Sequence, residues 1–315
     1  MQLGILGLPK VGKTTLFNTL TASTQATDKF AASKKTNVAV AKVPDPRLAQ
    51  LRDLFNPRKY IPATVQYVDI PGITKGEGSS ALNLDELRQV DALVHVVRAF
   101  DDPELLHAEG SIDVARDVET IDLELVFADH ALVERRLERL EKAVKRGLSA
   151  DEKREQALLQ DTILPALENE TPIRTLTLED DDEKRLRGFQ LLSAKPILQV
   201  INVGEDDVGQ ADGGAFGLPE GTPAVVVSAP IENEIAQLDD EEQMVFMEEL
   251  GLTEPSLDRV LRASYAMLGL ISFFTVGEDE VRAWTIRRGT IAKDGAGAIH
   301  SDIARGFIRA EVVFW

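Results

Sequence analysis

A phosphate-binding loop begins at the seventh residue of this chain and constrains the fold more than any other feature. Residues 7–14 read GLPKVGKT, a complete match to the pattern G-x-x-x-x-G-K-[ST]. The apolar run 2–6 before the loop is typical of a buried strand, and Leu16, Phe17 and Leu20 after it form an apolar stripe at helical spacing. This order of strand, loop and helix predicts a binding site for the phosphates of a nucleotide.

The residue types in the loop indicate how such a site works. Gly7 and Gly12 let the backbone wrap closely around phosphates, so that amide N–H groups and a helix N-terminus point at the anion. Lys13 is expected to reach the β- and γ-phosphates and to be catalytic, and Thr14 to ligate Mg²⁺. The nucleotide-binding residues expected in the loop are Gly7, Pro9, Lys10, Val11, Gly12, Lys13, Thr14 and Thr15.

The composition excludes several other classes of site. The chain has no cysteine, which rules out disulfides, thiolate nucleophiles and cysteine zinc sites. Its net charge of −18, from 35 basic and 53 acidic residues, opposes nonspecific attraction to nucleic acid and to anionic membranes. No apolar run approaches the roughly 20 residues that span a bilayer. We therefore expect a cytoplasmic monomer with no membrane contact and no DNA specificity.

Apolar runs also predict the main sheet. Continuous apolar strands are typical of a largely parallel sheet that is covered by helices on both faces. A further run at 38–43 is expected as an antiparallel edge strand. The buried strands are expected at 3–6, 64–68, 92–97, 196–201 and 224–227.

Two regions of the chain differ from this strand-rich pattern. Residues 113–192 lack strand runs and carry apolar residues at helical spacing, which predicts a helical coiled-coil arm with a break at 147–151. The alternating runs 271–276 and 281–286 predict a β-hairpin that opens a small α+β domain, and about forty-five residues is short for an independent core of this kind. The predicted fold is α/β, with a phosphate-loop NTPase domain formed by 1–112 and 193–270, the inserted arm at 113–192, and an incomplete C-terminal domain at 271–315.

A second phosphate-site motif, Asp-Ile-Pro-Gly, follows the strand at 64–68. In this position Asp69 is expected to hold Mg²⁺, and the N–H of Gly72 to meet the γ-phosphate as part of the catalytic site. The next residue is Ile73, where many GTPases place the glutamine that orients the attacking water. Because isoleucine cannot orient water, either intrinsic hydrolysis is slow or another residue, a partner or the bound cation environment positions the water.

The motif that reads the base is altered from the usual guanine pattern. GTPases normally use Asn-Lys-x-Asp after a core strand, and here the strand ends in Asn-Val-Gly-Glu. Glu205 is one methylene longer than aspartate, and Val203 removes the lysine stem that covers the base. Adenine has no donor at N1 for a carboxylate, whereas Asn202 and nearby backbone groups could pair with its N6 amine. The sequence therefore favours adenine and leaves dual specificity open, with Ser228 and Ala229 completing the base-side loop.

Together these motifs resemble the YchF subgroup, the Obg-like ATPases, among the Obg-related phosphate-loop GTPases of the TRAFAC class. The resemblance implies a nucleotide-binding domain interrupted by a coiled-coil arm, a TGS-type C-terminal domain, and hydrolysis of ATP in preference to GTP with a hydrophobic residue at position 73. It extends over essentially the whole chain. The segments that carry it are 7–20, 43–48, 69–72, 91–99, 202–205, 228–229 with Glu232 and Glu234, and 280–310.

The resemblance also implies a partner and further site residues. Members are associated with ribosomes, translation and stress responses, so the arm and the TGS-like domain are candidate contacts to the ribosome or ribosomal RNA. His107 falls where the family has a histidine discussed as catalytic, and the alternative is a surface histidine near the end of a helix or strand. The first switch region, 30–37, departs from the family pattern, so Ser33 and Thr36 compete as the Mg²⁺ ligand there.

The leading hypothesis is thus an ATPase switch whose cofactors are ATP (or GTP) and Mg²⁺. One alternative is a ribosome-binding scaffold that is gated by nucleotide and hydrolyses it negligibly. Another is a guanine-specific GTPase, which Glu205 disfavours.

Overall fold

The computed structural model describes residues 1–21, 37–70, 84–208 and 213–311. Within these residues the main sheet has six strands in the order β2-β4-β1-β5-β6-β7, and all are parallel except β2. This confirms the α/β fold with a mostly parallel sheet, and it confirms the antiparallel edge strand predicted at 38–43. The strands are β1 (Gln2–Leu6), β2 (Asn37–Lys42), β4 (Thr64–Asp69), β5 (Ala92–Arg98), β6 (Ile197–Asn202) and β7 (Ala224–Val227).

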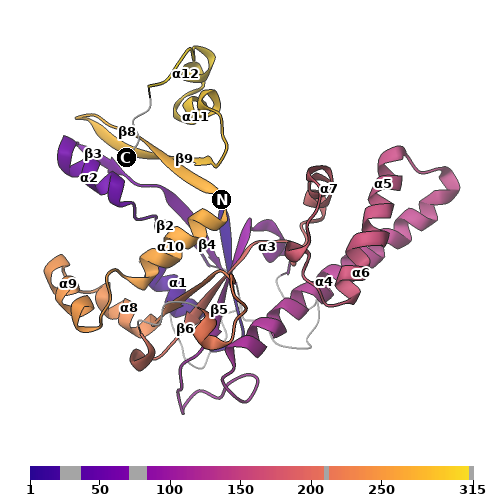
Figure 1. The fold of residues 1–315 in the computed structure, drawn as a ribbon, viewed down its shortest axis with the longest axis horizontal. Helices are drawn as coiled ribbons and strands as arrows, with labels where there is room; N and C mark the ends of the chain where they lie inside the picture. Colours follow the sequence, from indigo (N-terminus) through magenta and orange to yellow (C-terminus); the bar gives the residue numbers. More distant parts are fainter. Residues whose placement is uncertain (22–36, 71–83, 209–212, 312–315) are drawn as a thin grey trace.

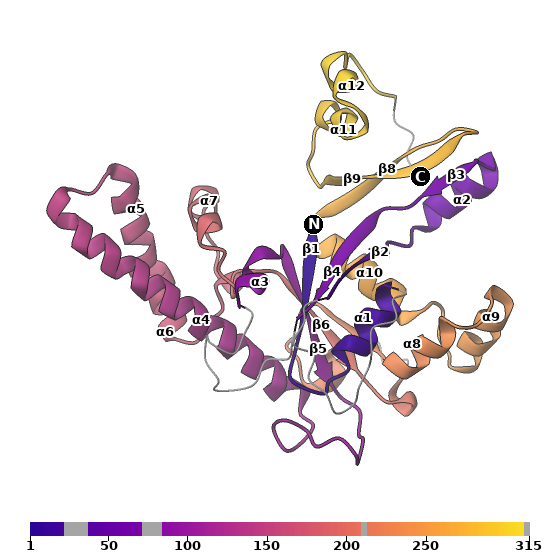
Figure 2. The ribbon, with the colours of Figure 1, turned by 180° about the vertical axis from the view of Figure 1, so that it is seen from behind.

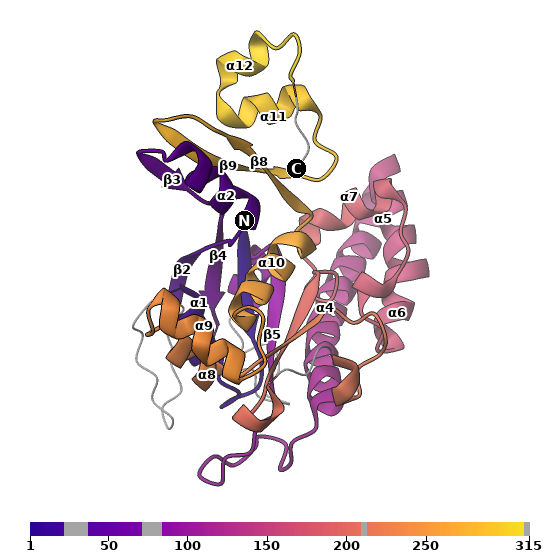
Figure 3. The same ribbon diagram turned by 60° about the vertical axis from the view of Figure 1, so that its left-hand side comes forward.

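Helices cover both faces of this sheet, which explains why its central strands are apolar on both sides. Every residue of β5 and β6 is buried. Helices α1 (Lys13–Thr21) and α10 (Ser256–Met267) lie on one face, and α4 (Val114–Ala143) lies on the other (Figure 3). Four further helices of this region are α2 (Pro46–Phe55), α3 (Leu84–Gln89), α8 (Ala229–Ile235) and α9 (Asp240–Glu249).

The arm is a helical hairpin that extends away from the sheet (Figure 1). Its first helix, α4, begins at the N-cap Asp113, and the chain turns at Gly147, which has a φ of +83°. A capping box between Ser149 and Glu152 starts α5 (Ala150–Leu158). After a π-helical turn, α6 (Leu164–Glu168) packs back against α4. Among the described residues from 113 to 192 there are helices and turns and no strand, as the apolar spacing predicted.

The predicted C-terminal hairpin is present as β8 (Leu270–Thr275) and β9 (Glu280–Arg287). It belongs to a second sheet, because β3 (Lys59–Ile61) pairs in parallel with β9. Strand β3 was not predicted from the sequence, because three residues are too few to show an alternating pattern. Helices α11 (Ala292–Ile299) and α12 (Ser301–Arg305) lie over this sheet at the end of the molecule that Figure 2 shows uppermost.

One buried histidine makes the stability of the sheet depend on pH. His95 on β5 is 1% exposed and lies opposite Gln199 of β6 in the strand register. Burial lowers the pKa of His95 from 6.5 to about 3, so the imidazole is neutral in the folded protein. Between these two values the unfolded chain binds more protons than the folded one. The free energy of unfolding therefore falls as the pH drops below 6.5.

We expect His95 alone to lower the free energy of unfolding by about 2 kcal/mol between pH 7 and pH 5. Denaturant titrations give the free energy of unfolding of the wild type and of His95→Gln at pH 7 and at pH 5. The contribution of His95 is the difference between the two proteins in the free energy that each loses between these pH values. The variant should lose less stability than the wild type on acidification. Equal losses in the two proteins would show that His95 is not held in its neutral form.

Candidate nucleotide-binding site

The predicted site residues meet at one edge of the main sheet. Parallel strands end at the same edge, and here the ends of β1, β4, β6 and β7 carry the phosphate loop, Asp69, Asn202 and Ser228. Helix α1 starts at Lys13, so its N-terminus faces the same region. The fold thus brings together four motifs that are spread over more than two hundred residues of the chain.

The loop backbone has a shape that two glycines make attainable. Gly7 has a φ of +148°, and a Cβ on it would lie 2.3 Å from the backbone oxygen of Val96. Gly12 has a φ of +95°, and a Cβ there would lie 2.4 Å from Nδ2 of Asn202. Both conformations are rare for residues with side chains, and both positions lack space for one. The two glycines of the motif are therefore required by the geometry of the loop.

Lys13 spans the loop from its buried position. Its Nζ donates to the carbonyl oxygens of Gly7 at 3.0 Å and of Leu8 at 2.7 Å. Burial lowers the pKa of Lys13 to about 8, against the opposing effect of the Asp69 carboxylate. An ammonium group has three N–H donors, and two of them have acceptors within the described residues. The side chain is therefore placed to bind an anion held by the loop.

Two oxygen groups that can coordinate a metal ion, the hydroxyl of Thr14 and the carboxylate of Asp69, lie together beside Lys13. The hydroxyl of Thr14 donates to Oδ2 of Asp69 at 3.3 Å. Asp69 is 4% exposed, and its burial raises the pKa of the carboxyl while Lys13 and Thr14 lower it. Hydroxyl and carboxylate oxygens are the ligands that Mg²⁺ takes in proteins, usually together with substrate phosphates. The donor set thus fits Mg²⁺.

Several predicted residues lie outside the part of the chain that the structure describes. These are the two candidate Mg²⁺ ligands of the first switch, Ser33 and Thr36, together with Gly72 of the second motif and Ile73, which follows it. Their roles stay predictions.

Asn202 joins the phosphate loop to the base-side loop. Its Nδ2 donates to the backbone oxygen of Val11 at 3.0 Å, and its Oδ1 accepts from the backbone N–H of Ala229 at 3.0 Å. The side chain is 3% exposed. In this geometry the amide positions the two loops that would surround a nucleotide, and its pairing with the base stays a prediction.

The other base-side residues occupy different environments. Val203 is 1% exposed and belongs to a small buried cluster that includes Leu218 and Val226. Glu205 is exposed at the start of a short 3-10 helix, Glu205–Asp207, so its carboxylate is accessible. The Ser228 hydroxyl is buried without a hydrogen-bond partner among the described residues. In the loop itself, Lys10 is exposed with a φ of +63°, and Pro9 and Thr15 are half-buried.

His107 is held by an acidic partner and is not a surface histidine. Its side chain is 5% exposed, and Nε2 lies 3.0 Å from Oδ2 of Asp117 on α4. Its Nδ1 accepts from the backbone N–H of Glu109 at 3.1 Å, so the proton of a neutral ring sits on Nε2. Within the described part of the chain, Nδ1 thus accepts from Glu109, and Nε2 lies beside Asp117 without a hydrogen bond. The catalytic role of His107 stays a prediction.

Arg98 organises the segment that carries His107, and the sequence analysis did not identify it. The guanidinium is buried at the end of β5 and donates to the carbonyl oxygens of Phe100, Asp102 and Leu105. It also stacks over the ring of Phe100, with 4.7 Å to the centroid. The available signal was a single charged residue at the end of a strand that is otherwise apolar.

No helix among residues 1–21, 37–70, 84–208 and 213–311 combines the length and the apolar character that crossing a membrane requires.

Comparisons with known proteins place this site in context. A family model described as 50S ribosome-binding GTPase matches residues 2–129, and the model of the C-terminal region of YchF GTPases, described as a protein of unknown function, matches residues 270–315. The ribosome-binding ATPase YchF of Bacillus subtilis is 43% identical to this chain, and that of Escherichia coli O157:H7 is 41% identical. Each alignment covers 98% of this chain and 87% of the relative.

Solved structures show the same likeness. The structure of the Schizosaccharomyces pombe YchF GTPase superposes on this chain with a TM-score of 0.82 and 31% sequence identity. The superposition covers 98% of this chain and 86% of the other.

Proposed function

Since the chain belongs to the YchF family of phosphate-loop GTPases, we propose that it is a Mg²⁺-dependent ATPase switch that acts on the ribosome in translation or stress responses. The observation that carries this proposal is that Lys13, Thr14 and Asp69 lie together at the edge of the sheet. They lie next to a loop whose backbone requires glycine at positions 7 and 12. The names of the relatives support the choice of ATP and of the ribosome.

In this proposal the chain binds the triphosphate through groups that already face the site. The loop amides and the N-terminus of α1 bind the phosphates, and Lys13 exchanges the carbonyl oxygens of Gly7 and Leu8 for phosphate oxygens. Thr14 and Asp69 hold Mg²⁺, which neutralises charge on the phosphate oxygens. Binding a multiply charged anion also favours the protonated form of Lys13, whose pKa burial lowers in the free protein.

The base side of the site favours adenine over guanine. Guanine recognition needs a carboxylate that accepts from N1–H and N2–H₂, and Glu205 is one methylene too long for the usual geometry. Val203 is buried in the core and covers no base. Asn202 fixes the base-side loop through the backbone N–H of Ala229, and we propose that carbonyl oxygens of this loop accept from the N6 amine.

Hydrolysis in this proposal depends on a partner. Position 73 carries isoleucine, which cannot orient the attacking water, and partners of related GTPases supply missing catalytic groups. We propose that the arm, 113–192, and the C-terminal region, 271–315, make the ribosome contacts, while 1–112 and 193–270 form the nucleotide-binding domain. Ribosome binding would then accelerate an intrinsically slow reaction.

Single-turnover hydrolysis of ATP, with and without ribosomes, tests the proposal. We expect a slow basal rate that ribosomes increase by about tenfold or more, which corresponds to at least about 1.4 kcal/mol of barrier. Ribosomes mixed with a Lys13→Ala variant control for ATPases that copurify with ribosomes. A protein that binds ribosomes but hydrolyses nothing in either condition would instead be the nucleotide-gated scaffold.

A further inference from the structure

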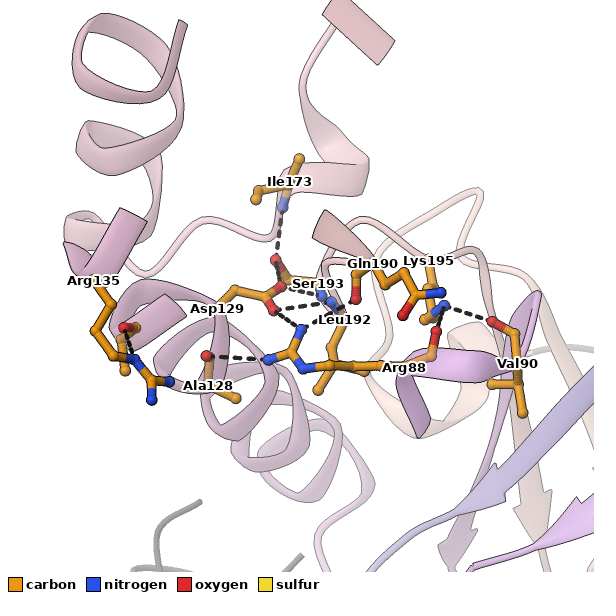
Figure 4. Close-up of polar contacts among 11 residues, drawn as sticks. Arg88, Val90, Ala128, Asp129, Arg135, Ile173, Gln190, Leu192, Ser193 and Lys195 are labelled. Carbon is orange, nitrogen blue, oxygen red and sulfur yellow. Dashed lines mark hydrogen bonds and ion pairs between the residues drawn. The ribbon is translucent and has the colours of Figure 1, made fainter. Parts of the chain in front are cut away.

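Segments that are distant in the sequence meet at the side chain of Asp129, on α4 at the base of the arm (Figure 4). Asp129 is fully buried, and its carboxylate accepts four hydrogen bonds. One comes from Nη1 of Arg88 at 3.1 Å and one from the backbone N–H of Leu192 at 3.0 Å. Ser193 donates the other two, from its backbone N–H at 2.7 Å and its hydroxyl at 2.8 Å. We call Arg88, Asp129, Ser193 and Lys195 the Asp129 hub.

Arg88 ties the helix α3 to the arm through three separate acceptors. Besides Asp129, its guanidinium donates to the carbonyl oxygens of Ala128 at 3.3 Å and of Gln190 at 3.1 Å. Lys195 holds the same helix end from the other side, because its Nζ donates to the carbonyl oxygens of Arg88 at 3.0 Å and of Val90. Helix α3, helix α4 and the segment 190–195 are thus joined by charged hydrogen bonds.

The hub lies where β5 and β6 begin, at the edge of the sheet opposite the nucleotide site, and the chain connects it to both sides of that site. Along the chain, α3 follows Asp69, the expected Mg²⁺ ligand, after the residues 71–83 that the structure leaves undescribed. Strand β6 begins two residues after Lys195 and ends at Asn202, which holds the phosphate loop. A change at the base side of the site can therefore reach the hub along β6.

The hub also borders free space. A cavity of about 980 Å³ is lined in part by Arg88, Gln190, Leu191 and Lys195. A buried carboxylate is costly to leave without its partners, so the three segments move together or exchange partners in discrete steps.

We propose that the Asp129 hub couples nucleotide occupancy to the position of the arm. This inference rests on the proposed function, since it needs a bound nucleotide. Coupling of this kind is reciprocal: a partner that binds the arm changes nucleotide affinity by the same factor as nucleotide changes partner affinity, typically about 5- to 150-fold. The hub is thus the element through which a ribosome contact on the arm reaches the phosphate loop.

Distances between two labels test this coupling directly. The chain has no cysteine, so Lys42→Cys on the exposed side of β2 and Glu138→Cys on the exposed face of α4 provide specific labelling sites. Pulsed electron spin resonance then measures the label distance without nucleotide and with AMPPNP and Mg²⁺. We expect AMPPNP to shift the distance distribution, and Arg88→Gln to lose at least about half of that shift while still binding AMPPNP in calorimetry.

Two further variants control for loss of folding and of charge. Arg185→Gln removes an arginine that pairs with Asp151 within the helical region, at 3.3 Å, and should keep the full shift. Arg88→Lys keeps the charge beside Asp129 but has its three N–H donors on one nitrogen, which cannot reproduce the separate contacts of Nη1 and Nη2. It should therefore also reduce the shift, even if Arg88→Gln does not fold. Two results would contradict the proposed coupling and leave the proposed function unaffected. One is a full distance shift in a folded Arg88→Gln or Arg88→Lys variant, and the other is the absence of a shift in a wild type that binds AMPPNP. A wild type that binds no AMPPNP would overturn both.

Discussion

Replacing Lys13 with alanine is expected to reduce the rate of ATP hydrolysis by about a hundredfold or more, the effect typical of removing one preorganised charge-stabilising donor. The ammonium is buried against the carbonyl oxygens of Gly7 and Leu8, where it is placed to face phosphates that the loop binds. Single-turnover hydrolysis measures the rate, and calorimetry measures the accompanying loss of ATP affinity.

The matched control for this variant is Lys153→Ala, which removes an exposed lysine from the arm. It should leave both the rate and the affinity unchanged. If Lys13→Ala hydrolysed ATP as fast as this control, the loop at 7–14 would not be the catalytic site.

Replacing Gly7 with alanine is expected to lower the free energy of unfolding by about 3 kcal/mol or more and to prevent nucleotide binding. The new Cβ would lie 2.3 Å from the backbone oxygen of Val96, and neither atom belongs to a flexible side chain that could move away. Urea denaturation measures the stability, and titration with ATP measures the binding.

Gly110 provides the matched control, because it has a φ of +80° but no described atom within 4 Å of the position that a Cβ would take. Gly110→Ala therefore tests the backbone strain alone, and it should cost about 1 kcal/mol. Equal destabilisation by the two substitutions would show that the close contact with Val96 does not shape the loop.

Local patterns predicted the phosphate side of the site well. The loop at 7–14 and Asp69 each follow a strand, and the parallel order of those strands is enough to bring Thr14 and Asp69 within hydrogen-bond distance. The edge strand at 38–43 and the hairpin near 271–286 were likewise visible as alternation or apolar runs. These features depend on residues that are close in the sequence or on a topology with few alternatives.

Contacts between distant segments left no such pattern. A strand of three residues, β3, shows no periodicity, so its pairing with β9 could not be predicted. His107 and Asp117 belong to different segments, and nothing in the intervening residues indicates that the chain folds back to pair them. Arg88 and Asp129 are separated by 41 residues, and no local pattern in the sequence indicates that they pair.

The sequence identified Asn202 as a residue of the base side, but only the structure shows which groups its side chain contacts. An asparagine at the end of β6 can face either a base or the neighbouring loops, and sequence cannot distinguish these. Asn202 contacts Val11 and Ala229, so it organises the site.

Calorimetric titration of the protein with ATP and with GTP, each in the presence of Mg²⁺, tests the central claim most directly. Our account predicts saturable binding of ATP with a Kd at least about tenfold lower than that of GTP, because Glu205 and the buried Val203 do not form a guanine site. A Kd for GTP about a hundredfold lower than that for ATP, a difference of about 2.7 kcal/mol, would contradict it and identify a guanine-specific GTPase.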